Sequence, residues 1–269
     1  MSGQFPQQDR PLAGCTIVIT RPAGTGATLA RHVRACGGIP LLLPGLSLRA
    51  MPDSRAAREQ WQEAQRGDVL IFTSPAAVRY AAVLSAPATR ATVIAVGQGT
   101  ARALRRLGID DVQVPLLRQD SEGLLDLPSL QQPQGRRVAL ITAPDGRGLL
   151  QEQLVARGAL LREVHVYRRV APRLGAHHID AVQHMSNTAC VLLSSAEAMH
   201  HLLALLPPAA RQRLCEARVV ASSDRIAGQA RESGFSRVYV AQSAAPADLV
   251  ARACDVCSHP RHEAGRPGC

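Results

Sequence analysis

The stretch TIVITRPAGTGATLARHVRACGGIPL, residues Thr16–Leu41, decides the fold because a second stretch repeats its pattern 121 positions later. That second stretch, Arg137–Arg162, reads RVALITAPDGRGLLQEQLVARGALLR and aligns with the first without a gap. Each begins with a short aliphatic run, which predicts a β-strand, and continues through a polar turn. Apolar residues then recur three and four positions apart, as Leu29, Val33 and Cys36 do, and this spacing predicts a helix.

The repeat extends beyond these two stretches. Phe72–Val78 matches Leu193–Met199 at the same offset of 121, and Val93–Val114 matches Val219–Val240 at an offset of 126. We infer a tandem duplication with one small change of length, which by itself would divide the chain at about residue 130. The strands that apolar runs predict are Thr16–Thr20, Val69–Phe72, Thr92–Val96, Val138–Ile141, Cys190–Leu193 and Val219–Ala221.

Helices are predicted between most of these strands. Strands that alternate with helices form parallel sheets covered on both faces. The sequence therefore predicts an α/β protein with two doubly wound parallel-sheet domains. Ligands of such sheets bind outside the carboxyl ends of the strands, so the turns after the strands are candidate sites.

Polar turns follow six of the predicted strands. Each places a hydroxyl group or a glycine directly before a helix, where free backbone N–H groups and the positive end of the helix dipole can hold an anion. Serine and threonine are also favoured helix N-cap residues, so capping alone can explain any single turn. The turns are Thr20–Pro22, Thr73–Pro75, Gly97–Thr100, Thr142–Arg147, Ser194–Ser195 and Ser222–Ser223.

The charge of the chain points in the same direction. All 31 basic residues are arginine and the formal net charge is +10. Without lysine, neither a lysine Schiff base nor a Walker A phosphate loop can form. The positive charge favours an anionic partner, although a genome rich in arginine codons would produce the same surface. Only 3% of residues are aromatic and no nucleic-acid-binding motif is present, so we expect a small poly-acid and no nucleic acid.

The remaining composition predicts a cytoplasmic protein with no membrane partner. No apolar run approaches the roughly 20 residues that span a bilayer, and the N-terminal residues lack the order of a secretory signal. The seven cysteines are odd in number, and four of them lie in apolar stretches. This pattern indicates reduced, mostly buried thiols.

Two sharper site hypotheses fail on inspection. Gly97–Arg102 has the start of a dinucleotide-binding fingerprint, but Arg102 stands where close packing requires glycine or alanine. The tail offers Cys254, Cys257, His259, His262 and Cys269 as zinc ligands, but their spacing matches no standard zinc finger. We therefore expect no cofactor, no metal and a frayed terminus from about residue 255.

Tyr167 is a candidate for proton transfer. It follows the apolar residues Val164 and Val166 at the predicted end of a strand and is one of three tyrosines. Its phenol is protonated at neutral pH and can donate a proton or a hydrogen bond. A half-buried tyrosine with a purely structural role would show the same pattern, so both interpretations stay open.

A series of short motifs runs through the chain in a fixed order. They are Thr20–Pro22, Phe72–Val78, Val96–Ala101 with Leu104 and Gly108, Asp120–Leu124, Gly146–Arg147 with Arg157–Ala159, Val166–Arg168, Ser194–Ser195 and Gly234–Phe235. In this order and spacing they resemble the uroporphyrinogen-III synthase family, over roughly residues 14–254.

The resemblance implies two flavodoxin-like domains joined by a two-stranded connector, with a cleft between them. Since the first strand and helix of that family belong with the C-terminal half, the domains would comprise residues 1–40 plus 172–269 and residues 41–171. It also implies a lyase of tetrapyrrole and heme biosynthesis. Its substrate would be hydroxymethylbilane, a linear tetrapyrrole that loses water and closes to uroporphyrinogen III with ring D inverted through a spiro intermediate. We expect a monomer that uses no cofactor.

Position within the family implies that Tyr167 donates the proton to the leaving hydroxide. The carboxylates of hydroxymethylbilane suit arginines and helix N-termini. The implied substrate-binding residues are Arg21, Thr73, Ser74, Gly97, Thr100, Ser121, Arg147, Ser194 and Ser195. Many relatives carry a Gly and Thr turn where this chain has Ser222–Ser223, so the resemblance does not extend a substrate contact to Ser223. The alternative of another class is a non-catalytic two-lobed protein that binds or senses a small anion.

Overall fold

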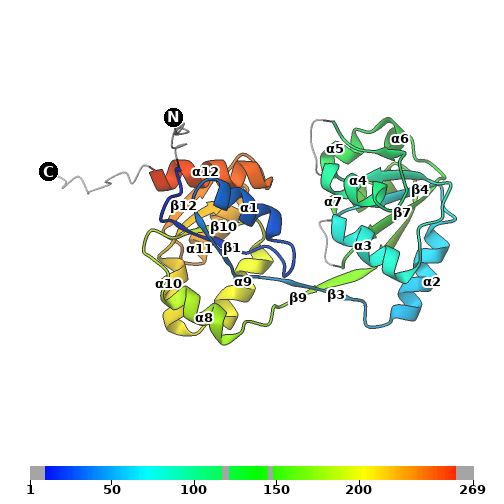
Figure 1. Cartoon of the computed structure of the whole chain (residues 1–269). Helices are drawn as coiled ribbons and strands as arrows, with labels where there is room; N and C mark the ends of the chain where they lie inside the picture. Colours follow the sequence, from blue (N-terminus) through cyan, green and yellow to red (C-terminus); the bar gives the residue numbers. More distant parts are fainter. Residues whose placement is uncertain (1–9, 117–120, 145–147, 259–269) are drawn as a thin grey trace, which may run out of the picture. The chain divides into compact units, whose positions relative to one another are not determined.

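The computed structural model describes residues 10–116, 121–144 and 148–258, and the chain divides into two compact units (Figure 1). Unit 1 comprises Met1–Ser47 and Val170–Cys269, and unit 2 comprises Leu48–Arg169. Residues 41–47 thus belong to unit 1, whereas the sequence assigned them to the other domain. Residues 41 and 42 lie in β2, Ile39–Leu42, and the pairing of β2 with β1, Thr16–Ile19, holds this segment in unit 1.

Unit 1 contains a sheet of five parallel strands in the order β12-β11-β10-β1-β2. Counted along the chain this order is 2-1-3-4-5, which is the order of flavodoxin-like proteins. The strands beside β1 and β2 are β10, Cys190–Leu193; β11, Arg218–Ala221; and β12, Arg237–Val240.

Helices cover both faces of the unit 1 sheet. Alternate strand residues point to opposite faces, so Val18 packs into one apolar layer and its neighbour Ile17 into the other. The first layer is closed by α8, Ala176–Gln183; α9, Ala196–Leu205; α10, Pro208–Cys215; and α11, Asp224–Glu232. The second is closed by α1, Ala27–Ala35, and α12, Pro246–Ser258.

The C-terminal helix runs further than the sequence predicted. Helix α12 continues to Ser258, so a frayed terminus from about residue 255 is wrong for residues 255–258. Val256 is buried in the second apolar layer, and its burial holds the last turn against the sheet.

Unit 2 contains a second sheet of five parallel strands, in the order β6-β5-β4-β7-β8. Counted along the chain this order is 3-2-1-4-5, which differs from the flavodoxin-like order because the unit begins with the central strand β4. The strands are β4, Val69–Phe72; β5, Thr92–Ala95; β6, Val112–Gln113; β7, Arg137–Thr142; and β8, Leu160–His165.

The unit 2 sheet is also covered on both faces. One apolar layer is closed by α2, Ser54–Ala64; α3, Pro75–Leu84; and α4, Gln98–Arg105. The opposite layer is closed by α5, Ser121–Leu125; α6, Pro128–Gln131; and α7, Leu149–Ala156. The doubly wound α/β class and its parallel sheets are therefore confirmed for both units, and each of the six predicted strands lies within one residue of an observed strand at both ends.

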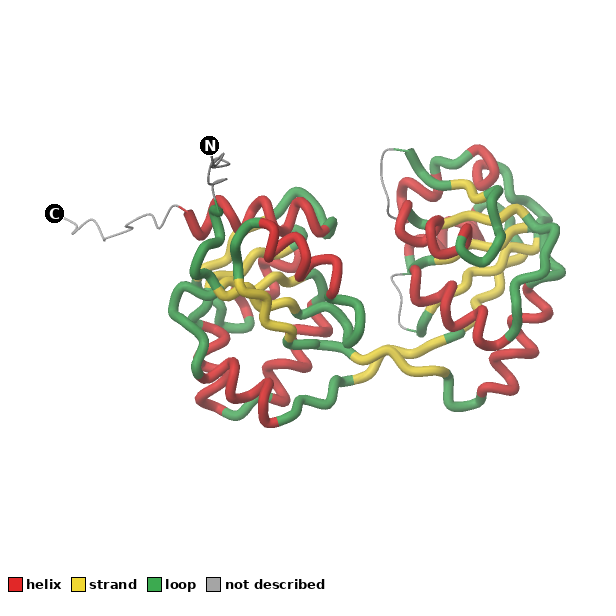
Figure 2. Tube along the Cα trace, viewed as in Figure 1, coloured by secondary structure: helices red, strands yellow, loops and turns green. Residues whose placement is uncertain are grey.

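Two further strands form a separate two-stranded sheet where the chain passes from one unit to the other. They are β3, Ser47–Ala50, and β9, Tyr167–Val170, and they appear as the thin yellow pair in Figure 2. Among the helices that the structure describes, none combines the length and the apolar character needed to cross a membrane.

Candidate functional site

The order of the strands identifies one switch point in each sheet. In unit 2, β4 and β7 are neighbours, but α3 after β4 packs on one face and α7 after β7 packs on the other. Unit 1 has the same arrangement at β1 and β10, which α1 and α9 follow on opposite faces. Open α/β sheets bind ligands just outside the carboxyl ends of the strands at such a point.

Thr73 lies at the switch point of unit 2. Its hydroxyl oxygen is 3.2 Å from the carbonyl oxygen of Ile141 and 3.0 Å from the hydroxyl oxygen of Thr142. Since a hydroxyl group has one proton, Thr73 donates to one of these oxygens at a time. The contacts join the ends of β4 and β7 and place two hydroxyl groups side by side.

Ser74 caps α3 and also contacts Tyr167. Its side-chain oxygen accepts a hydrogen bond from the backbone N–H of Ala77 at 3.0 Å, so the capping interpretation is confirmed at this turn. The same oxygen lies 3.2 Å from the phenol oxygen of Tyr167. Ser74 is half-buried, whereas Tyr167 is buried.

Tyr167 is buried rather than half-buried, with 6% of its surface exposed. Its ring stacks on Tyr80 at a centroid distance of 5.4 Å and an interplanar angle of 18°. Tyr80 donates its own hydrogen bond to the carbonyl oxygen of Leu48 at 2.8 Å. The single strand predicted to end at Tyr167 is divided, because β8 ends at His165 and β9 begins at Tyr167.

The other predicted residues of unit 2 differ in position. Gly97 is the N-cap of α4 with an extended backbone, which any residue can adopt. Thr100 lies in the first turn of α4 and is only 2% exposed, because this face of the helix packs on the sheet. Ser121 is the first residue of α5, and Arg147 lies outside the described residues.

The switch point of unit 1 is built in a similar way. Thr20 donates its hydroxyl proton to the carbonyl oxygen of Leu192 at 2.8 Å and thereby joins the ends of β1 and β10. Ser195 accepts a hydrogen bond from the N–H of Ala198 at 3.2 Å and caps α9. Ser194 is half-buried beside it.

Arg21 directly follows Thr20 and is half-buried. Its guanidinium donates a hydrogen bond to the carbonyl oxygen of Ala244 at 2.5 Å, and burial lowers its pKa from the ordinary value. No carboxylate within the described part of the chain forms an ion pair with it. A partly desolvated cation without a counter-charge favours an anionic ligand at this edge.

The sequence analysis did not identify two residues that lie near these groups. Tyr80 was not assigned a role, although its position in the helix that Ser74 begins is a signal that could have linked it to the site. Thr142 was recognised as part of a turn but not as a site residue. Its contact with Thr73 depends on strand pairing, which the local pattern does not specify.

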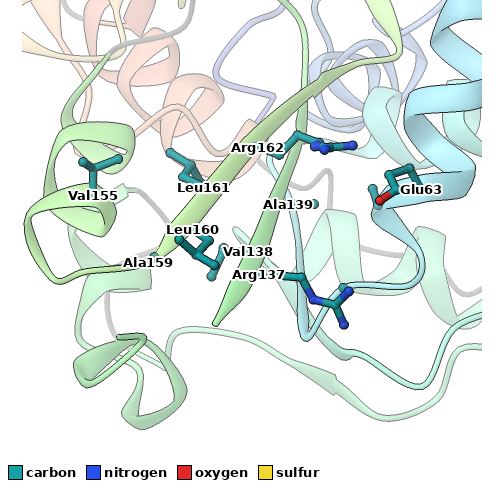
Figure 3. Close-up of a pocket in the computed structure, with 11 residues that line it drawn as sticks. Glu63, Arg137, Val138, Ala139, Val155, Ala159, Leu160, Leu161 and Arg162 are labelled. Carbon is teal, nitrogen blue, oxygen red and sulfur yellow. The ribbon is translucent and has the colours of Figure 1, made fainter. Parts of the chain in front are cut away.

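A cavity of about 560 Å³ lies elsewhere in unit 2 (Figure 3). Arg137 and Leu160, the first residues of β7 and β8, line it, so it opens at the amino end of the strands. Arg162 and Glu63 also line it, as Figure 3 shows. This cavity is therefore separate from the hydroxyl groups at the carboxyl edge. Among the described residues, no group of His, Cys, Asp or Glu side chains could hold a metal ion.

Comparisons with known proteins agree on one family. A family model described as uroporphyrinogen-III synthase HemD matches residues 27–251. The uroporphyrinogen-III synthase of Salmonella typhimurium is 31% identical over 235 residues, and that of Escherichia coli is 30% identical over 245 residues. Each alignment covers 85% of this chain and 96% of the relative.

Solved structures support the fold. A mutant uroporphyrinogen III synthase from Thermus thermophilus has a TM-score of 0.56 at 22% identity. The enzyme from Helicobacter pylori has a TM-score of 0.60 at 14% identity. Each match covers 90% of this chain and 99% of the other. The motifs, the two parallel sheets and the family model that spans most of the sequence lead to one conclusion: the chain belongs to the uroporphyrinogen-III synthase family.

Proposed function

We propose that this chain converts hydroxymethylbilane to uroporphyrinogen III, with inversion of ring D and loss of water. Membership of the family carries the proposal, and the hydroxyl groups at the carboxyl edge of unit 2 provide a place for the chemistry. We further propose that the protein acts as a monomer, without a cofactor and without a nucleic-acid partner.

The substrate-binding role that we propose rests on charge and hydrogen-bond donors. Hydroxymethylbilane carries acetate and propionate carboxylates on its rings, and a guanidinium binds such groups through charge-assisted hydrogen bonds. Arg21 has no carboxylate partner among the described residues and lies beside Ser194 and Ser195 at the switch point of unit 1. In unit 2, Thr73 and Ser74 occupy the corresponding position, and Gly97, Thr100, Ser121 and Arg147 stay proposed contacts.

The proton-donating role that we propose for Tyr167 includes a path for the proton, which the positions of Tyr167 and Ser74 support. The C–O bond of the hydroxymethyl group breaks more easily when a proton reaches the departing oxygen. Tyr167 is buried, whereas Ser74 is half-buried and within hydrogen-bond distance. The proton therefore passes from the phenol through the hydroxyl of Ser74, which replaces its own proton as it gives one away. Holding the flexible hydroxymethylbilane molecule in the conformation that closes the ring supplies most of the remaining rate enhancement.

The proposal that both units arose by duplication gains support from strand register. Thr16 pairs with Ile39 in unit 1, and Arg137 pairs with Leu160 in unit 2, so both partners are shifted by 121 positions. Gly158 likewise follows Gly37 by 121 positions, and each has a positive φ, 82° and 84°, just beyond a helix. Only a residue without a Cβ adopts this conformation at little cost.

The direct test is isomer analysis. Purified protein is incubated with hydroxymethylbilane, the products are oxidised, and the type I and type III porphyrins are separated. The proposal predicts the type III isomer at a rate that depends on protein concentration. Formation of the type I isomer alone, which arises spontaneously, would refute it and would leave the non-catalytic anion-binding alternative.

A further inference from the structure

A second hollow of unit 2, with a volume of about 950 Å³, is lined by charged side chains. Three segments form it: residues 65–68 before β4, residues 88–92, which lead into β5, and residues 136–137, which lead into β7. It therefore lies at the amino end of the strands, away from the hydroxyl groups at the carboxyl edge. Four arginines line it against one carboxylate, that of Asp68. The arginines are Arg66, Arg90, Arg136 and Arg137.

Hydrogen bonds hold the three segments together. The N–H of Thr92 donates to the carbonyl oxygen of Asp68 at 3.0 Å, and the N–H of Asp68 donates to that of Arg137 at 2.9 Å. Gln65 joins the first two segments again, since its carbonyl oxygen accepts the hydroxyl of Thr89 at 2.8 Å. The backbone that carries the arginines is thus ordered before any ligand arrives, which lowers the entropic cost of binding.

The arginines of this hollow have few counter-charges. Asp68 is engaged by Arg137, because its Oδ2 accepts the backbone N–H of Arg137 at 2.7 Å and its Oδ1 lies 3.5 Å from the guanidinium. The half-buried Arg136 donates to the carbonyl oxygens of Ser129 and Asp68, at 3.2 and 3.5 Å. Arg90 is exposed and forms no hydrogen bond or ion pair with the residues that the structure describes.

The fourth arginine is paired only weakly. Arg66 forms an ion pair with Glu63 at 3.5 Å, and exposed pairs of this kind contribute little. Arg90 and Arg136 have no carboxylate partner within the described part of the chain. Because a guanidinium binds phosphate through two parallel hydrogen bonds, such groups are suited to hold an anion.

The duplicated unit shows that the fold does not require arginine at these positions. Unit 1 repeats the strands of unit 2 at offsets of 121 and 126 and also forms a sheet of five parallel strands. The residues that correspond to the four arginines, in the same order, are Asn187, Glu216, Cys15 and Thr16. The parallel sheet therefore forms without this basic cluster, which leaves binding as its role.

The remaining lining indicates a compact ligand of high charge. It consists of one glutamine, one glycine, two threonines and two alanines, so no aromatic or large aliphatic side chain is available to cover a ring. The cavity of Figure 3 differs, because Val138, Leu160 and Leu161 line it. The starts of β5 and β7, on either side of β4, are roughly 10 Å apart, since neighbouring strands lie about 4.8 Å apart. Arginines at this spacing suit an elongated anion with several charged groups.

We propose that this hollow binds an oligophosphate, a short chain of phosphate groups, through Arg90 and Arg136 with Arg66 and Arg137 beside them. A linear chain of phosphates presents charged oxygens along its whole length, which matches arginines that follow three neighbouring strands. The hollow lies at the opposite ends of the strands from the proposed reaction, so this binding is independent of the proposed function.

The first experiment measures binding of inorganic tripolyphosphate to the full chain by titration calorimetry, without divalent cations. We expect saturable binding of one tripolyphosphate per chain, and its absence in the parent would overturn the proposal. The double variant R66Q/R90Q should weaken binding roughly tenfold or more, since hydrogen bonds to charged groups contribute at least that much. Both positions are exposed, so the variant should fold, and thermal unfolding without ligand checks this.

The matched control is R31Q/R55Q, which removes the same charge from exposed positions on α1 and α2. It should bind tripolyphosphate almost as tightly as the parent does. Equal weakening in both double variants would show that the anion follows only the net positive charge of the chain, and would refute the site. A third variant, R21Q, tests the place of binding. Loss of binding in R21Q but not in R66Q/R90Q would assign the anion to the carboxyl edge and overturn the proposal.

The second experiment compares ligands. Citrate carries three carboxylates and no phosphate, and we expect it to bind more weakly than tripolyphosphate. ATP carries the same chain of three phosphates on a nucleoside, and we expect it to bind no more tightly, because nothing in the lining covers a base. Citrate that binds as tightly as tripolyphosphate would refute the assignment to phosphate. ATP that binds more tightly would refute recognition through the phosphate chain alone.

Discussion

The phenol oxygen of Tyr167 lies 3.2 Å from the hydroxyl oxygen of Ser74, although 93 positions separate the two residues. Ser74 directly follows β4 and caps α3, whereas Tyr167 begins β9. The serine oxygen also accepts the N–H of Ala77, and either hydroxyl of the Ser74–Tyr167 pair can donate to the other. This pair gives unit 2 a buried phenol with the hydroxyl of a half-buried serine beside it.

Replacing Tyr167 with phenylalanine should slow turnover by roughly 10- to 1000-fold. This range overlaps the contribution that a general acid ordinarily makes to the rate and extends below it. The fold should persist because the ring still stacks on Tyr80. Turnover and thermal unfolding are measured together. The matched control is Tyr80→Phe, which removes a hydroxyl bonded to the Leu48 carbonyl and should leave turnover almost unchanged. Equal turnover in Tyr167→Phe and the parent would assign Tyr167 a structural role.

Replacing Ser74 with alanine should lower both stability and rate. The loss of the N-cap should cost about 1 kcal/mol of unfolding free energy, and the rate should fall about as far as in Tyr167→Phe, because the proposed proton path runs from the phenol through this hydroxyl. Ser223→Ala is the control, since Ser223 caps α11 through Ile226. Denaturant unfolding should show a similar loss in both variants. A rate loss of the same size in Ser223→Ala would show that the effect is one of stability.

Replacing Arg21 with glutamine should raise KM by roughly 10- to 100-fold, since a hydrogen bond to a charged group contributes about 1.5–3 kcal/mol. The guanidinium is half-buried, and no described carboxylate competes for it. Initial rates at several substrate concentrations separate KM from kcat. Arg31→Gln is the control, because Arg31 is exposed on α1 and its guanidinium donates a hydrogen bond to the hydroxyl of Thr28. Unchanged KM in Arg21→Gln would remove Arg21 from the binding site.

Replacing Gly45 with alanine should destabilise unit 1 by about 1–3 kcal/mol through overpacking. A Cβ at Gly45 would lie 2.5 Å from both the Cβ and the carbonyl oxygen of Ala198, in the first turn of α9. Gly228→Ala is the control, because a Cβ in that helical position meets nothing within 4 Å. It should stabilise the protein by about 0.4–1 kcal/mol. Equal unfolding free energies in the two variants would contradict the close approach.

Unfolding free energy should fall as the pH is lowered below about 6.5, in part because of His178. Burial and the neighbouring His177 lower the pKa of His178 in the folded state. Its Nδ1 accepts a hydrogen bond from the N–H of Gly175 at 3.1 Å, and only the neutral ring can do so. The unfolded chain therefore binds the proton more readily, and stability is lost as the pH falls from the unfolded pKa toward the folded one.

The variant His178→Asn should reduce this pH dependence, because it removes the ring whose pKa is lowered in the folded state. Denaturant unfolding at pH 7.5, 6.5 and 5.5 provides the comparison. An identical slope of stability against pH in the parent and in His178→Asn would exclude the contribution of His178.

The sequence predicted local structure well because period and capping are local properties. Short apolar runs located the strands, helical spacing located the helices, and the offset of 121 anticipated the matching registers of β1 with β2 and of β7 with β8. Ser74, Ser195 and Ser223 cap helices, as their position before a helix indicated. The polar turns were expected at the carboxyl edges, and the order of the strands places them there.

The sequence by itself determined the class of fold, the family and the kinds of side chain at the strand ends. Only the tertiary structure decided which strand ends are neighbours, and with them the contacts of Thr73 with Thr142 and of Ser74 with Tyr167. It also decided that α12 reaches Ser258, with Val256 buried in the apolar layer over β1 and β10. The physical reason is that the spacing of apolar residues along the chain decides whether a segment forms a strand or a helix. Which elements then lie beside that segment depends on how all the elements that share a sheet pack together.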